Sequence, residues 1–285
     1  MKKGKTIFLV LLTIVFLGTL PGSNFAQSGP LPLAELQRTA LYKSLDEALQ
    51  NPSQVYRLNL TNQNLTALPA EIGTLNNLQY CNLSKNQLTS LPPEIKHLRN
   101  LQWLILEDNN IASLPGEITE LTNLEVLNLD GNSALDVDGA FQVAGAIPSL
   151  KELSMNKVLI NTLPKSFFSL NNVEKLYLSN TGLNYFPEEM GQLYKLKVLD
   201  LTFNNIVTVP SDIEDMKRLL EIYLGGNQIT KFPIEIQELR YTLQKISLAS
   251  TSEVSGSLVG NPISEEEVIK LQQWLPKTVI ENIYK

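Results

Sequence analysis

The chain has 285 residues, of which 43% are hydrophobic and 18% charged, and its formal net charge is -6 at pH 7. A negative chain argues against generic binding to polyanions such as nucleic acid. Cys81 is the only cysteine, so an intrachain disulfide is excluded and the fold must be stabilised by packing alone.

Residues 1–26 have the composition of a secretory signal peptide. Three lysines precede an apolar run from Ile7 to Leu20, and small residues follow it up to Ala26. This order is typical of signal peptides. We expect cleavage after Ala26, which would change the net charge from -6 to -9. The alternative is an uncleaved membrane anchor, although the apolar run is short for a membrane span.

After cleavage, the chain has no stretch that is long and apolar enough to cross a bilayer. We therefore expect no membrane insertion of the mature protein. The predicted location is secreted, periplasmic or on the cell surface.

Residues 27–54 are interpreted as a lead-in followed by an N-terminal cap helix. Ser44 and Glu47 have the spacing of a capping box, in which each side chain satisfies a backbone N–H at a helix start. Such a helix would cover the first repeat, because the end of a repeat array has an open core. The apolar positions expected on its buried face are Leu41, Leu45, Ala48 and Leu49.

Residues 55–263 consist of a repeated unit of about 23 residues, with eight full copies and one degenerate copy. Residues 78–100 and 101–123 share the skeleton L-x-x-[LC]-x-L-x-x-N-x-[LI]-x-x-L-P-x-E-I-x-x-L-x-N. A period of this length indicates a solenoid. Position one of the units falls at Val55, Leu78, Leu101, Leu124, Leu150, Val173, Leu196, Leu219 and Leu243.

Each unit is predicted to form a strand, a turn and a convex return. Apolar residues at positions four and six alternate with outward residues, which indicates a strand with one buried face. A Leu-Pro pair further along should end the strand pairing and begin a short helical or 3-10 turn. Position nine should carry a structural asparagine whose amide bonds backbone groups at the bend. These asparagines are Asn86, Asn109, Asn132, Asn204 and Asn227.

Other residues occupy position nine in the remaining units. Gln63, Thr181 and Thr251 can partly replace the asparagine, whereas Val158 cannot. Because valine has no side-chain hydrogen-bonding group, we expect a locally altered turn in repeat five.

Three segments depart from the regular unit. Residues 136–148 of repeat four lack the Leu-Pro pair, and this repeat has three extra residues; we predict a small-residue helix on the convex side, or alternatively a docking bump. Residues 249–262 are rich in serine, glycine and threonine and are predicted to be a loop. Residues 264–285 start with a second capping box and predict a C-terminal cap helix and tail.

By these residues the chain resembles the leucine-rich repeat family, in the exported bacterial type with 23-residue repeats carrying L-P-x-E-I-x-x-L-x-x-L. The resemblance covers residues 44–280. It implies an α/β solenoid: a curved horseshoe with a parallel concave sheet, short convex turns and helical caps at both ends. It also implies binding to another protein, and it carries over no catalytic residue.

Function is expected on the concave face, at positions three, five, seven and eight. The candidate residues for partner binding are Tyr80, Trp103, Ile105, Glu107, Asp108, Tyr177, Phe203 and Tyr223. The first three should form one exposed aromatic patch and the last three a second cluster. Acidic residues, including Asp130, and the lysines Lys151, Lys157 and Lys175 lie between them. Apolar patches rimmed by charge are typical of interface cores.

Other interpretations of the same residues remain open. Aromatic residues favour strands in any case, and sugar rings could stack on Trp103 or Tyr177 in a glycan-binding surface. The acidic residues lack the loop spacing of a calcium site. His97 and Cys81 should lie on different sides of the coil, so they cannot form a nucleophile and base pair. We predict a non-catalytic monomer that binds a protein, without a cofactor or metal.

Overall fold

The computed structural model describes residues 29–252 and 257–282. The expected signal peptide lies outside these residues. Short strands follow one another along the solenoid. They are β1 (Leu41–Tyr42), β2 (Arg57–Asn59), β3 (Tyr80–Asn82), β4 (Trp103–Ile105), β5 (Val126–Asn128), β6 (Glu152–Ser154), β7 (Lys175–Tyr177), β8 (Val198–Asp200), β9 (Glu221–Tyr223), β10 (Lys245–Ser247), β11 (Ala249–Thr251), β12 (Leu258–Gly260) and β13 (Val279–Glu281).

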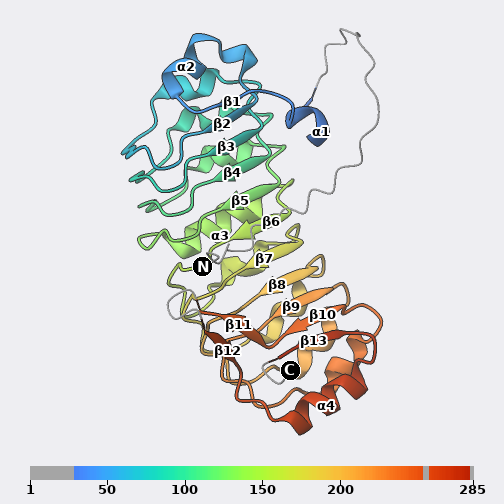
Figure 1. The fold of residues 1–285 in the computed structure, drawn as a ribbon. Helices are drawn as coiled ribbons and strands as arrows, with labels where there is room; N and C mark the ends of the chain where they lie inside the picture. Colours follow the sequence, from blue (N-terminus) through green and yellow to red (C-terminus); the bar gives the residue numbers. More distant parts are fainter. Residues whose placement is uncertain (1–28, 253–256, 283–285) are drawn as a thin grey trace.

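Strands β1 to β10 and β13 form one 11-stranded sheet in that order, and the pairings within it are parallel. Figure 1 shows the sheet running along one side of a curved stack, from the blue N-terminal end to the red C-terminal end. The register pairs equivalent positions, so that Tyr80 lies beside Trp103 and Trp103 beside Val126. The predicted leucine-rich repeat solenoid with a parallel sheet is confirmed.

The convex side carries short 3-10 helices, each beginning just after a proline in the repeats that keep the Leu-Pro pair. Proline suits this place because its φ is fixed and it needs no donor partner. The 3-10 helices, including η1 in the N-terminal cap, are η1 (Pro52–Gln54), η2 (Ala70–Thr74), η3 (Pro93–His97), η4 (Gly116–Glu120), η5 (Lys165–Ser169), η6 (Glu188–Gln192), η7 (Ser211–Asp215) and η8 (Ile234–Leu239).

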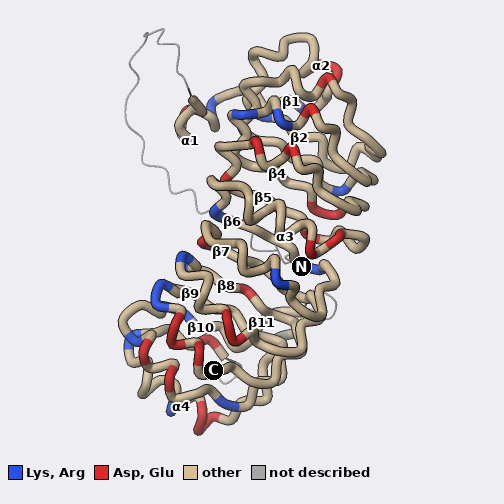
Figure 2. The backbone as a smooth tube through the Cα atoms, turned by 180° about the vertical axis from the view of Figure 1, so that it is seen from behind, with Lys and Arg blue, Asp and Glu red and all other residues tan. Residues whose placement is uncertain are grey.

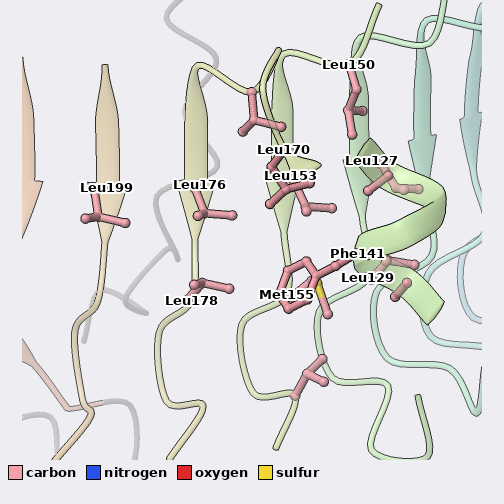
Figure 3. Packing of buried hydrophobic residues seen from close by; sticks show 14 of the residues in the cluster. Leu127, Leu129, Phe141, Leu150, Leu153, Met155, Leu170, Leu176, Leu178 and Leu199 are labelled. Atoms are coloured by element: carbon pink, nitrogen blue, oxygen red, sulfur yellow. The ribbon is translucent and has the colours of Figure 1, made fainter. Parts of the chain in front are cut away.

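The helix predicted in repeat four is present as α3 (Val137–Ala146) on the convex side. Its Phe141 ring meets Phe167 of η5 edge to face, with the ring centroids 5.3 Å apart. Figure 3 shows Phe141 among the layered leucines and Met155 of the core. The extra residues of this repeat therefore supply a buried aromatic contact, because a full helix needs a larger side chain to fill the space beneath it.

The turn asparagines bond the coils on both sides of them. The Oδ1 atom of Asn86 accepts hydrogen bonds from the N–H groups of Gln63 and Leu65 in the preceding repeat, at 2.9 and 3.0 Å. Its Nδ2 donates to the carbonyls of Leu60 and Leu83, at 2.9 and 2.8 Å. Bonds of the same kind are made by Asn109, Asn132, Asn204 and Asn227.

This ladder of asparagines is interrupted in repeats five and six, residues 150–195, which we call the seam. Val158 is buried at position nine, and the backbone N–H of Ile160 donates instead to the carbonyl of Thr181, at 2.8 Å. The Thr181 hydroxyl donates to the carbonyl of Leu178, at 3.0 Å. Repeat five therefore has a turn without the asparagine bonds.

The N-terminal cap differs from its prediction in one respect. Helix α2 (Leu45–Gln50) begins after Ser44, whose hydroxyl accepts from the Glu47 N–H at 3.4 Å. Leu41 is not on that helix; it lies in β1, which extends the sheet beside β2. A short helix, α1 (Leu33–Leu36), lies within the lead-in. The open end of the sheet, as well as the core, is therefore covered.

The C-terminal end contains strands where a loop and a tail were predicted. β11 and β12 form an antiparallel hairpin between Leu248 and Asn261. The Asn261 amide donates to the carbonyls of Leu248 and Leu224, at 3.1 and 2.8 Å, so it takes the place of the turn asparagine. The expectation that Thr251 would do so is wrong, because the inserted hairpin moves the turn ten residues along the chain. Helix α4 (Glu265–Trp274) follows, and β13 then pairs with β10.

Candidate functional site

The sheet register brings the residues of the first patch together on the concave face. Tyr80 pairs with Trp103 across β3 and β4, and Asn82 pairs with Ile105. All four are partly buried rather than freely exposed, because neighbouring strands lie only about 4.8 Å apart and their side chains shield one another.

These side chains line a hollow of about 580 Å³ that spans β3 to β7. The uncharged residues around it are Tyr80, Asn82, Trp103, Ile105, Val126 and Asn128. The charged residues around it are Glu107, Glu125, Lys151, Glu152, Glu174 and Lys175. The sequence grouped Tyr80, Trp103 and Ile105, which the register brings together, but it did not show that the surface is hollowed.

Lysine–glutamate pairs cross the strands beside the hollow. The Lys151 ammonium is 2.6 Å from Glu125, and the Lys175 ammonium is 3.1 Å from Glu152. Lys197 pairs with Glu174 at 2.7 Å from the next repeat. Figure 2 shows Lys and Arg (blue) interleaved with Asp and Glu (red) along the backbone, and not separated by sign. The lysines expected to be available to a partner, Lys151 and Lys175, are thus each paired with a glutamate of the same chain, and both stay about half exposed.

A second feature of the concave face was missed in the sequence: an asparagine or aspartate at position five caps the backbone after its strand in repeats one, two, four and seven. Asn82 accepts from the N–H of Ser84 at 2.9 Å, and Asn128 accepts from the N–H of Asp130 at 2.8 Å. Bonds of this kind compete with the sheet ladder for the N–H at position seven. The signal available in the sequence was the recurrence of asparagine or aspartate two residues before position seven.

At the seam, position five holds Ser154 and Tyr177, and side chains of the preceding repeats take over. Asp130 Oδ1 accepts from the backbone N–H of Asn156 at 2.7 Å. The Asn156 amide oxygen in turn accepts from the N–H of Ser179 at 2.7 Å. The concave end of each seam strand is therefore capped from one repeat earlier in the chain.

The Asp130 carboxyl group is buried beneath this network. Burial raises its pKa to about 6, and hydrogen bonds from Ser154 and Asn156 oppose that rise. The Ser154 hydroxyl donates to it at 2.6 Å. Asp130 therefore titrates close to neutral pH and serves the fold, because its oxygens are occupied by neighbouring strands.

Asn128 lines the hollow and is 1% exposed. Its Nδ2 has no hydrogen-bond partner among the residues that the structure describes, although its oxygen caps Asp130. A buried amide N–H without an acceptor costs about 1–3 kcal/mol. This donor is therefore a place where a bound group would gain from supplying an acceptor.

The second cluster is less compact than the first. Tyr177 and Tyr223 lie on β7 and β9, with Asp200 of β8 between them. The Tyr223 hydroxyl donates to Glu221, and its ring lies 5.0 Å from the Lys245 ammonium. Phe203 lies outside this row, at a turn, where a Cβ added to Gly226 would come within 2.6 Å of its ring.

Position eight of the repeat lies in the turn and has a left-handed backbone conformation. Asp108 and Phe203, which were assigned to partner binding, both have φ of 53° there. A left-handed backbone is costly for residues other than glycine, asparagine and aspartate. The residues with positive φ at this position are Asn62, Lys85, Asp108, Gly131, Lys157, Asn180, Phe203 and Gly226.

Cys81 and His97, the residues considered as a nucleophile and base pair, lie on different sides of the coil. Cys81 is 1% exposed, and burial raises the pKa of its thiol to about 12. His97 is exposed at the end of η3 on the convex side. Within residues 29–252 and 257–282, no group of three or more His, Cys, Asp or Glu side chains could hold a metal ion. In the same part of the chain, no helix has the length and apolar character needed to cross a membrane.

Two solved internalins have a similar fold along most of this chain. Internalin inlF from Listeria monocytogenes is 18% identical over 88% of this chain and 75% of its own, with a TM-score of 0.63. Internalin C2 from the same species is 23% identical over 67% of this chain and 80% of its own, with a TM-score of 0.55.

A third, InlJ, is 19% identical over 70% of this chain and 40% of its own, with a TM-score of 0.52. No curated protein matches the sequence. The family model described as "Leucine-rich repeat region" matches residues 43–173, and the one described as "Leucine Rich Repeat" matches residues 195–216. The chain belongs to the leucine-rich repeat family.

Proposed function

We propose that the protein is an exported, non-catalytic module that binds a protein partner through the concave face of β3 to β7. The observation that carries this proposal is the hollow of about 580 Å³ around Tyr80, Trp103 and Ile105. Aromatic side chains in partly buried positions are the usual centres of protein interfaces.

Two features of the fold support recognition as the role. The repeated leucines are buried in the core. The side chains that differ from repeat to repeat, and that could distinguish one partner from another, lie on the open face of the sheet. Both ends of the core are covered, by α2 with β1 and by α4 with β13. A capped array stays soluble without a second copy, which supports a monomer.

Export is part of the same proposal. It is supported by the signal-like composition of residues 1–26 and by a fold shared with bacterial internalins. The separation of Cys81 and His97 supports a role without catalysis.

The proposal is tested by partner capture with and without the first patch. Residues 27–285 would be immobilised and exposed to envelope extract and to candidate host proteins, and captured proteins identified by mass spectrometry. The double variant Tyr80→Ala and Trp103→Ala should lose the captured partner and keep its melting transition. The matched control is Tyr194→Ala with Tyr241→Ala, because these rings are 55% and 79% exposed away from the hollow.

A partner retained by the Tyr80 and Trp103 variant would reject the concave site. A glycan array with the same sample separates the second class of ligand, since Trp103 and Asn82 in one hollow could also hold a sugar ring. Recovery of a glycan, with no protein lost on mutation, would replace the proposal by glycan binding.

A further inference from the structure

We propose that the hollow receives one uncharged, apolar side chain of the partner, and that a backbone carbonyl beside this side chain accepts a hydrogen bond from Asn128. This inference rests on the proposed function and specifies the chemistry of its anchor. It concerns the same site, at β3 to β7.

The first step is the charge of the lining. Both lysines that line the hollow are in ion pairs with glutamates that also line it, Lys151 with Glu125 and Lys175 with Glu152. Two further glutamates line the hollow, Glu107 and Glu174, and Glu174 is paired with Lys197. A charged partner group would compete with ion pairs that already exist, whereas a neutral group would not, which lowers the advantage of charge.

The second step is the apolar floor. Trp103, Ile105 and Val126 come from adjacent strands in register, and Tyr80 extends the row by one strand. Their side chains are partly buried, so they are held in place before a partner arrives. Such a floor favours a branched aliphatic or aromatic side chain.

The third step is the amide of Asn128. Its Oδ1 is fixed by the N–H of Asp130 at 2.8 Å, which leaves Nδ2 as the atom that needs an acceptor. Because Nδ2 is itself buried, side chains of the lining must shift for a partner's acceptor to reach it. An apolar side chain cannot supply one, but the peptide group next to it can. A peptide segment with an apolar side chain therefore satisfies both the floor and the donor.

The test uses small probes, because they report on the hollow without the natural partner. Trp103 becomes the single tryptophan reporter in a Trp274→Phe background, since the chain contains two tryptophans. N-acetyl-leucine amide should quench or shift Trp103 fluorescence saturably. It should bind at least tenfold more tightly than N-acetyl-arginine amide, N-acetyl-glutamate amide or methyl glucoside. Its dissociation constant should change less than twofold between 50 and 500 mM NaCl.

A matched pair of variants isolates the amide donor. Asn128→Asp keeps the acceptor for the Asp130 N–H and removes the donor, and it should weaken binding of the leucine probe at least fivefold. Asn59→Asp makes the same change at position five of the first repeat, outside the lining, and should leave binding unchanged. If Asn128→Asp does not fold, the ranking of the probes on the wild-type surface still decides.

Three results would overturn the inference. They are tighter binding of the arginine or glutamate probe, binding of the glucoside alone, and no saturable response to the leucine probe. Capture of a protein partner that depends on Tyr80 and Trp103, together with a preference for the arginine probe, would keep the proposed function and reject the uncharged anchor.

Discussion

The backbone bends in the same way in the turns of repeats two to four and in the turns of the seam. Different groups form the hydrogen bonds to its N–H and C=O groups in the two regions. In repeats two to four, Asn86, Asn109 and Asn132 bond both the preceding repeat and their own. In the seam, that position holds Val158 and Thr181. The Ile160 N–H donates to the carbonyl of Thr181, and the Thr181 hydroxyl donates to the carbonyl of Leu178. The comparison shows that a solenoid can lose its turn asparagine where backbone groups and a hydroxyl take over part of the bonding.

The largest expected effect is in the regular block. Leu106 is fully buried at position six of repeat three, so Leu106→Asp would bury a charge without a partner. We expect a loss of more than about 5 kcal/mol and separate unfolding of the neighbouring repeats. Circular dichroism during urea unfolding measures this. The matched control is Leu159→Asp, where the side chain is 67% exposed; a folded, cooperative Leu106→Asp protein would contradict the assigned register.

An intermediate effect distinguishes the two kinds of turn directly. Asn109→Ala removes the acceptor of the Leu88 N–H and the donor to the carbonyls of Leu83 and Leu106, each at 3.0 Å. Leaving these buried groups unpaired should cost about 3–4 kcal/mol. Thr181→Ala removes a single hydroxyl donor, which faces the Leu178 carbonyl and Asn204 Oδ1 at 3.0 Å each, and should cost about 1 kcal/mol. Equal losses in urea unfolding would mean that the two turns do not differ in energy.

A further effect, which depends on pH, is expected in the seam. The pKa of Asp130 is raised from 3.8 to about 6 in the folded protein, so the folded state holds this proton more tightly than the unfolded state. Its contribution to stability is present at pH 4 and is lost as pH rises toward 7, by about 2–3 kcal/mol at most. Asp130→Asn removes that dependence. Urea unfolding at several pH values from 4 to 7 measures this. The free energy of unfolding of the wild-type protein should fall relative to that of Asp130→Asn as pH rises, and an unchanged difference would reject the assignment.

Much of the fold could be predicted because its signal recurs. The 23-residue period places Leu104 and Leu106 in the core and Tyr80 beside Trp103, since equal positions stack in register. What recurs only once could not be predicted. A two-residue strand such as β1 has no period of its own, so Leu41 was assigned to a helix instead. The hairpin of β11 and β12 separates Leu248 from Asn261 and hides the last turn from alignment.

The site was predictable in part for the same reason. The columns identified the first patch, but a hollow depends on how far each side chain rises from the sheet, and sequence does not give that height. Phe203 was placed with Tyr177 because its position was counted as inward-facing, although the left-handed turn directs the chain differently there. The pairs Lys151 with Glu125 and Lys175 with Glu152 could have been found, because equal positions of adjacent repeats carry opposite charge.

The hairpin between Leu248 and Asn261 also makes the last repeat an insertion point. Asn261 closes the turn behind the hairpin, so the residues between them can change in number while the strand and the turn keep their bonds. Lengthening a surface loop is cheap, at about 0.6 kcal/mol for each doubling. A fluorescent reporter or affinity tag placed there would leave the hollow at β3 to β7 open.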